Sequence, residues 1–194
     1  MIPLPEPSCR AMPVDISIPV RNQILAGRVR MLHLPGPRAA FLQTGDCLWV
    51  REMFRVLPSG AGLIDVTYGS EQVRSIRWPA VLPRPSIGVH MPEAMPVHLS
   101  RMTLIVLMAR TIRLQQVNED DACAAGVILH RDGFGHDWAP VAEWPGALEA
   151  YGRRWDLWHG AEGPICWGAN PELREITFRA VTRNIGDLLP GIGP

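Results

Sequence analysis

The chain has 194 residues, of which 47% are hydrophobic and 20% charged, a composition that excludes a disordered or fibrous protein. Its 19 basic and 19 acidic residues cancel, so net charge excludes long-range steering toward nucleic acid or acidic membranes. Every basic residue is arginine, whose planar fork of N–H donors suits phosphates, carboxylates and aromatic rings.

The cysteines lie far apart, without the paired spacing of a zinc site or a disulfide framework. We therefore predict free thiols. No apolar run reaches the roughly 18 residues that a membrane span needs, and the first residues are too rich in proline for a signal peptide. These features predict a cytoplasmic protein without a membrane partner. The cysteines are Cys9, Cys47, Cys123 and Cys166.

The predicted domain covers residues 16–185, between an irregular N-terminal arm and a short tail at 186–194. The arm, residues 1–15, contains four prolines, which forbid a helix and interrupt strand pairing. A proline at the first turn and a glycine at the end predict a helix over 19–27. Its apolar side consists of Val20, Ile24 and Leu25.

The middle of the chain predicts mainly strands. Residues 47–57 follow a Gly–Asp turn, and the glycine-rich turn after them predicts a hairpin with 63–68. Residues 69–99 contain five prolines and few periodic segments, so they predict a long ordered loop or insertion. Residues 101–117 are apolar on both faces through Met108, which is typical of a strand buried on two sides.

The last third predicts two helices and a strand. Asn118 is a good N-cap for a short helix that Gly126 ends, and residues 143–160 show helical spacing of apolar side chains. Residues 174–181 alternate as a strand does. The whole order predicts an α+β fold built on a small, barrel-like sheet with flanking helices.

A second insertion is predicted over residues 127–142. It contains His130 and His136, with aspartates nearby, so a metal site deserves consideration. The spacing matches no standard ligand pattern, and a polar surface loop is the preferred interpretation. We predict no metal and no cofactor for this chain.

Four stretches, in this order, resemble the ASCH domain, a branch of the PUA-like superfamily, and most closely its members in phages and prophages. They are "PVRNQILAGRVR", "GDCLWVREMF", "RPSIGVHMPEAMPVHLSRMTLIVLMARTIRLQQVNEDDACAAGV" and "RWDLWHG…CWGANPELREITF". The resemblance covers about residues 16–181. It implies a PUA-like β pseudo-barrel, a cleft between the first helix and the barrel, and recognition of RNA or of a modified nucleotide.

Some ASCH members hydrolyse the amide of acetylated cytidine with a lysine, a threonine and a glutamate. The matching positions here are Val29, Leu32 and Ala125, and none of these side chains can transfer a proton. The sequence therefore predicts binding without this hydrolysis, and it offers no catalytic residue of the family type.

Ten residues are candidates for binding RNA or a nucleotide, through phosphate contacts, base stacking or polar contacts. Most also have a structural interpretation: Trp49 as core, Arg51 with Glu52 and Arg101 as structural charges, Arg28 as the partner of a helix dipole, Arg84 with Ser86 as a packed crossover, and Asn170 as a turn former. Both interpretations stay open at this point. The candidates are Arg28, Arg30, Trp49, Arg51, Glu52, Arg84, Ser86, Arg101, Trp167 and Asn170.

Three functions compete. The first is a module that binds RNA or a modified nucleotide. The second is a phage or prophage interaction or regulatory protein that binds a host or phage protein and keeps the barrel only as a scaffold. The third is a nuclease or nucleoside hydrolase that works by another route, for instance through Glu52, His90 or His33.

Overall fold

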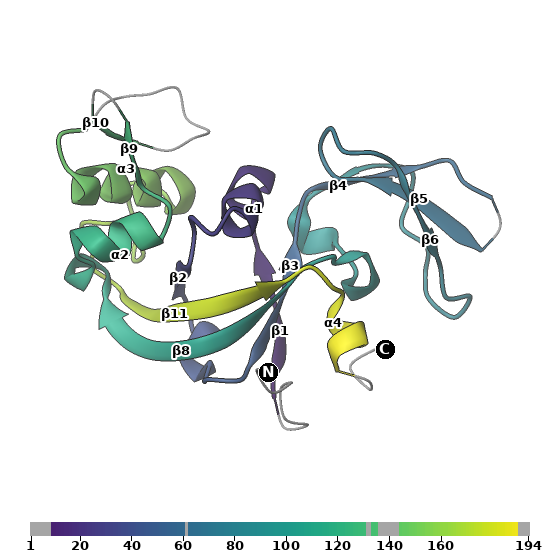
Figure 1. Ribbon diagram of the computed structural model, residues 1–194, viewed down its shortest axis with the longest axis horizontal. Coiled ribbons are helices and arrows are strands. Elements are labelled where there is room, and N and C mark those ends of the chain that lie inside the picture. Colours follow the sequence, from purple (N-terminus) through teal and green to yellow (C-terminus); the bar gives the residue numbers. More distant parts are fainter. Residues whose placement is uncertain (1–8, 61, 131–132, 136–143, 190–194) are drawn as a thin grey trace. The chain divides into compact units, whose positions relative to one another are not determined.

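The computed structural model describes residues 9–60, 62–130, 133–135 and 144–189. Over these residues the protein is α+β, with more strands than helices (Figure 1), as the sequence predicts. The chain divides into two compact units, each built from segments that are far apart in sequence. The first unit comprises Met1–Arg21, Cys47–Leu104 and Val181–Pro194, and the second comprises Asn22–Asp46 and Ile105–Ala180.

The first unit contains most of the short strands. Its elements are β1 (Ala11–Asp15), β3 (Cys47–Arg51), β4 (Phe54–Leu57), β5 (Leu63–Thr67), β6 (Arg74–Arg77), β7 (Gly88–His90) and α4 (Ile185–Leu188), with the start of α1 (Ile18–Leu25) and of β8 (Thr103–Arg113). The second unit continues α1 and β8 and adds β2 (Met31–Pro35), α2 (Glu119–Ala124), β9 (Ile128–His130), β10 (Gly133–Gly135), α3 (Ala147–His159) and most of β11 (Glu172–Val181). Single 3-10 turns occupy Ala39–Phe41, Pro92–Ala94, Val97–Leu99 and Leu114–Gln116.

β1 lies in the stretch for which the sequence predicted an irregular arm. It pairs in parallel with β3, with Ala11 opposite Cys47 and Asp15 opposite Arg51. Pro13 is tolerated because β1 is the edge strand of its sheet, where a missing N–H breaks no ladder on the open side. The helix that follows begins within one residue of its predicted start.

The predicted strand over 47–57 is two strands, β3 and β4, separated by Glu52 and Met53. The predicted hairpin is confirmed, because β4 pairs antiparallel with β5 and places Val56 opposite Val66. Residues 69–99, predicted as a loop, add β6 and β7. Among the described residues these strands form a small sheet in the order β6-β5-β4-β7.

The small sheet has a core of its own. Alternation turns Phe54 and Val56 of β4 and Ile64 and Val66 of β5 to the same side, where each is at most 1% exposed. Tyr68, Trp78, Met95 and Leu99 complete this buried cluster.

In the second unit β8 lies beside β11, and β11 pairs antiparallel with β2 (Figure 1), with Ile176 opposite Leu32. The larger sheet has the order β1-β3-β8-β11-β2. The described strands thus end at two edges and form no closed barrel. The PUA-like pseudo-barrel, and the single domain over 16–185, stay predictions.

α2 and α3 pack together over a buried cluster that includes Ala122, Tyr151 and Trp155. The predicted cap of α2 is confirmed: Asn118 Oδ1 accepts a hydrogen bond from the Asp121 N–H at 2.9 Å, and the Asp121 carboxylate accepts one from the Asn118 N–H. This reciprocal pair fixes where the helix begins.

β9 and β10 form a short antiparallel hairpin inside the predicted insertion, with Phe134 opposite Leu129. His136 lies outside the described residues. The four cysteines are free thiols, with 3.9 Å between the sulfurs of Cys9 and Cys47. In the part of the chain that the structure describes, no helix has both the length and the apolar character to cross a membrane.

The α2 cap gives a first test of the fold. Replacing Asn118 by alanine removes a hydrogen bond to the first turn, and we expect the free energy of unfolding to fall by about 1 kcal/mol. Asn118→Ser restores a capping oxygen at the same site and is the matched control. Urea unfolding of the three proteins measures the effect. Equal losses for both variants would contradict the capping role.

Candidate functional site

Glu52 is the centre of an ionic network in the first unit. Its carboxylate is fully buried and accepts two hydrogen bonds from Arg101, from Nε at 2.9 Å and from Nη2 at 2.8 Å. The Nε of Arg21 lies 3.7 Å from the same carboxylate. Glu71 binds both arginines, with its Oε1 2.8 Å from Arg21 Nη1 and 3.0 Å from Arg101 Nη2.

The chemistry of this network is that of a closed ion-pair cluster. Burial alone would lower the pKa of the Arg101 guanidinium, but the hydrogen bonds to Glu52 and Glu71 outweigh it and raise the pKa overall. The guanidinium also lies 3.9 Å from the centre of the Tyr68 ring. Burial raises the pKa of Tyr68 to about 12. At neutral pH Arg101 is therefore charged and the Tyr68 hydroxyl is protonated, so neither is a general base.

Arg51 and Glu52, although adjacent, contact different partners. The Nε and Nη2 of Arg51 donate to the Asp15 carboxylate at 2.6 and 2.9 Å. Its guanidinium lies 5.8 Å from the centre of the half-buried Trp49 ring. This side chain therefore joins β1 to β3, and the structural interpretation accounts for its contacts.

The Arg84 region is an ordered part of the small sheet. Arg84 Nη2 donates to the Ser59 hydroxyl at 2.5 Å and to the Leu63 carbonyl oxygen. The carbonyl oxygen of Ser86 is in hydrogen-bond contact with His90 Nε2 at 2.7 Å. His90 also stacks on Phe54 with 4.8 Å between the rings.

The other four predicted residues belong to the second unit. Arg28 and Arg30 are exposed and follow α1. Trp167 packs against the cluster beneath α3. Asn170 has φ of 49°, a conformation that asparagine tolerates better than most residues, and its Oδ1 accepts a hydrogen bond from the Gln115 N–H at 2.9 Å. It forms a turn, as its structural interpretation predicts.

A buried polar chain runs through the second unit from α3 to β11 and β8. The Tyr151 hydroxyl lies 2.8 Å from His33 Nδ1, and His33 Nε2 lies 3.3 Å from Glu175 Oε2. Because a carboxylate only accepts hydrogen bonds, Nε2 carries the proton, and in the neutral ring Nδ1 accepts from the tyrosine. Arg110 Nε donates to the other carboxylate oxygen at 2.5 Å.

Every buried group in this series of hydrogen bonds, from Tyr151 through His33 to Glu175, has a partner. Burial acts to raise the pKa of the Glu175 carboxyl, but the hydrogen bonds from His33 and Arg110 outweigh it and lower the pKa overall. Tyr151 and Glu175 are at most 2% exposed. Tyr151, His33 and Glu175 contact one another and are buried, and only Arg110, whose side chain is 53% exposed, reaches solvent, so we assign this series of hydrogen bonds a structural role.

Among the described residues of the second unit, Gln23 and Arg179 have buried side-chain atoms without a hydrogen-bond partner, and Gln23 is the one in which both a donor and an acceptor are affected. It is 1% exposed, and neither its Nε2 nor its Oε1 has a hydrogen-bond partner among the described residues. A buried amide left in this state costs about 1–3 kcal/mol per unsatisfied group. The side-chain donor and acceptor of Gln23 are thus left unsatisfied by the contacts of the described residues.

Backbone turns bring the neighbours of Gln23 together. The N–H groups of Arg28 and Val29 donate to the Gln23 carbonyl oxygen at 2.9 and 3.3 Å, and the Arg30 N–H donates to Ala124 at the end of α2. Gly126 follows that end with φ of +102°. A Cβ at Gly126 would lie 2.8 Å from Val29 Cγ2 and 3.1 Å from Gln23 Oε1.

Arg154 of α3 is the charged member of the Gln23 cluster, which we define as Gln23, Val29, Gly126 and Arg154. Its Nη1 would lie 3.3 Å from a Cβ at Gly126, and its Nη2 donates to the Ala125 carbonyl oxygen at 2.9 Å. The guanidinium lies 5.1 Å from the centre of the Trp158 ring. Burial lowers the pKa of Arg154 to about 10, so the side chain stays charged at neutral pH.

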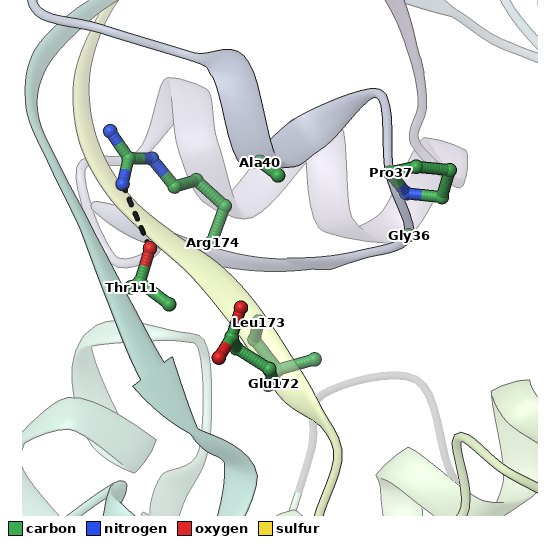
Figure 2. Close-up of a pocket in the computed structure, with 7 residues that line it drawn as sticks. All are labelled: Gly36, Pro37, Ala40, Thr111, Glu172, Leu173 and Arg174. Atoms are coloured by element: carbon green, nitrogen blue, oxygen red, sulfur yellow. Dashed lines mark hydrogen bonds between the residues drawn. The ribbon is translucent and has the colours of Figure 1, made fainter.

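A separate cavity of about 220 Å³ lies beside β11 in the same unit (Figure 2). Its volume is below the roughly 300 Å³ at which sites for larger organic ligands begin. Its one arginine, Arg174, is already committed: Nη1 donates to the Thr111 hydroxyl and Nε to the Leu42 carbonyl oxygen, both at 3.0 Å. This cavity is a poor candidate for a nucleotide.

Sequence reasoning missed the cluster although a signal was present. Gln23 follows Val20 by three positions, which places both on one side of a helix. The predicted apolar side included Leu25, which is 45% exposed, whereas Val20 and Ile24 are buried as expected. Among the described residues no group of three His, Cys, Asp or Glu side chains is placed to hold a metal ion.

Comparison of the chain with protein-family models, with curated proteins and with solved structures found no match.

The ionic network gives a second test. Glu52→Gln leaves Arg101 without its buried counter-charge, and we expect the free energy of unfolding to fall by about 2–4 kcal/mol. Glu93→Gln changes an exposed carboxylate and should alter it by less than about 0.5 kcal/mol. Denaturant unfolding compares the variants. Similar effects at both positions would show that Glu52 has no special role.

Glu71 gives a third test, through pH. Hydrogen bonds from Arg101 lower the pKa of the Glu71 carboxyl below its ordinary value of 4.5. Its contribution to stability is therefore complete above about pH 5 and is lost as the pH falls through the folded-state pKa. The difference in unfolding free energy between the native protein and Glu71→Gln should shrink as the pH falls from about 5 to about 3. A difference that stays constant or widens toward acid would contradict the account.

Proposed function

We propose that the protein is a binding module of the ASCH, PUA-like type that recognises RNA or a modified nucleotide without hydrolysing it. The observation that carries this proposal is the buried amide of Gln23, whose donor and acceptor both lack partners among the described residues. The side-chain amide of glutamine presents an N–H donor next to a carbonyl acceptor. It is therefore complementary to the edge of a nucleobase, which also presents a donor next to an acceptor.

The resemblance supports this position for the site. Val29 and Ala125, which match the lysine and the glutamate of hydrolytic ASCH members, are 1% and 6% exposed and lie in or beside the Gln23 cluster. Leu32, which matches the threonine, is partly buried in β2. The region that performs proton transfer in those members is apolar here, and a recognition group stands next to it.

The other members of the cluster suit a nucleotide as well. Arg154 is a buried cation beside the half-exposed ring of Trp158. Unpaired bases stack on aromatic rings and on guanidinium planes. Guanidinium groups also pair with phosphates. Gly126 has no side chain, and a Cβ there would crowd the Gln23 amide.

A hydrolase by another route has less support. Each residue named for it already has an internal partner: Glu52 binds Arg101, His90 contacts the Ser86 carbonyl oxygen, and His33 lies between Tyr151 and Glu175. A general base has to lie within hydrogen-bond reach of a substrate. These side chains form hydrogen bonds within the protein instead.

Gln23→Met separates recognition from folding. Methionine keeps the length of the side chain but has no strong donor or acceptor, so the unsatisfied amide disappears. We expect the unfolding free energy to rise by about 1 kcal/mol, while affinity for the ligand falls at least about tenfold, because a nucleobase edge loses its partners. Gln72→Met, at an exposed position, is the matched control.

The measurements are urea unfolding and calorimetric titration with labelled single-stranded RNA and a panel of nucleoside monophosphates, acetylated cytidine included. Binding by no member of the panel would contradict the proposed function. Affinity that is unchanged in Gln23→Met would contradict the assignment of the site. Release of acetate from acetylated cytidine would contradict the loss of hydrolysis.

A further inference from the structure

The small sheet of the first unit has one packed face and one open face. Side chains directly opposite each other in an antiparallel pair lie on the same face. Phe54, Val56, Ile64 and Val66 occupy the packed face. The register therefore places the pairs Arg55–Val89, Arg55–Thr67 and Leu63–Arg77 on the other, open face, which we call the arginine face.

The arginine face has an excess of positive charge. Arg55 and Arg77 are exposed, and within the described residues neither side chain has a hydrogen bond or ion pair. Arg84 is exposed beside them through its hydrogen bonds to Ser59 and Leu63. The acidic residue that the register places here, Asp65, accepts a hydrogen bond from the Ser75 hydroxyl at 2.6 Å. The positive charge of the arginine face therefore favours the binding of an anionic partner.

The uncharged side chains decide what kind of anion fits. Leu63 lies opposite Arg77 and Val89 lies opposite Arg55, and they are 41% and 55% exposed, so each of the two arginines has an exposed aliphatic side chain beside it, with Asp65 between the two pairs. The aromatic rings nearest in sequence, Phe54, Tyr68 and Trp78, are all at most 8% exposed in the core beneath. Proteins that bind single-stranded nucleic acids combine positive charge with exposed aromatic rings on which bases stack. A polypeptide needs aliphatic contacts and counter-charges, and the described part of this face offers both.

We propose that the arginine face docks an extended acidic segment of a protein partner. Its glutamate or aspartate side chains pair with Arg55 and Arg77, and its aliphatic side chains cover Leu63 and Val89. From the register, these arginines lie two strands apart and four residues along the strand direction, which is a diagonal of roughly 16 Å. About five extended residues span that distance. This surface is separate from the Gln23 cluster, and the inference does not depend on the proposed nucleotide recognition.

The test uses three labelled probes and the full chain. The first is a peptide of about twelve residues, rich in glutamate with interspersed valine. The second has glutamine in place of every glutamate, and the third is a single-stranded oligouridylate. Fluorescence anisotropy at low salt should show binding of the acidic peptide, weaker binding at about 0.3 M salt, and none of the glutamine peptide.

The variants locate the surface. Arg55→Glu combined with Arg77→Glu should weaken binding of the acidic peptide by at least about tenfold, whereas the double lysine variant should retain most of it. Arg153→Glu changes an arginine of the second unit whose side chain is 69% exposed and should have no effect. If the variant with Arg55→Glu and Arg77→Glu fails to fold, the glutamine peptide and the variant with Arg55→Lys and Arg77→Lys still test the charge requirement.

Two results would overturn the inference. One is the absence of acidic-peptide binding by the native protein, or binding that the glutamate pair leaves unchanged. The other is oligouridylate binding that the glutamate pair abolishes without any binding of the peptide, which would make the arginine face a nucleic-acid surface. Loss of nucleotide binding in Gln23→Met alone bears on the other site and leaves this inference standing.

Discussion

A carboxylate removed from water has to be neutralised where it lies, and Glu52 imposes this constraint on the first unit. It stands between the end of β3 and the start of β4, and its counter-charges come from Arg101, just before β8, and Arg21 in α1. Glu71 binds the same two arginines and, with Tyr68, extends the cluster to the segment after β5. One buried charge thus fixes how α1, the small sheet and the start of β8 meet. Removing Glu52 would leave the two arginines with only the partly exposed Glu71, and removing Arg101 would leave Glu52 with only the more distant Arg21.

The second unit shows the opposite case. Its buried chain from Tyr151 through His33 to Glu175 is satisfied at each link, so it stabilises the fold and has no capacity left for a ligand. Gln23, a short distance along the sequence from His33, has its full capacity unused among the described residues. A buried polar group without a partner is uncommon in a folded protein and needs an explanation, whereas a fully hydrogen-bonded one is explained by the fold. The proposed function depends on this difference and not on the number of arginines.

Local patterns in the sequence predicted the elements that local forces determine. The hairpin of β4 and β5 follows from alternation and a glycine-rich turn, α2 from its capping residue, and β11 from its alternation. β1 was missed because Pro13 argues against a strand, and the fact that β1 is an edge strand depends on pairing with a segment more than thirty residues away. β6 and β7 were missed for a similar reason: each is short, and each is a strand only because a neighbour pairs with it.

The candidate site was harder to predict than the fold. The choice of Arg101 as a binding residue was reasonable by type, but a sequence does not state which carboxylate an arginine meets, and Glu52 and Glu71 saturate this one. Conversely, Arg55 and Arg77 drew no attention, since only the register shows that they share an open face. Gln23 looked like an ordinary helix residue. Its importance depends on the absence of a partner in three dimensions, which no local pattern encodes.

The most direct measurement of the central claim is the side-chain amide resonance of Gln23 in an NMR titration with the RNA and nucleotide panel. A ligand whose base edge pairs with this amide should shift the two Nε2 protons strongly and slow their exchange with solvent, while the amide of Gln72 stays unchanged. If a bound ligand leaves the Gln23 resonance where it was, the amide is not the recognition group and the account of the site is wrong.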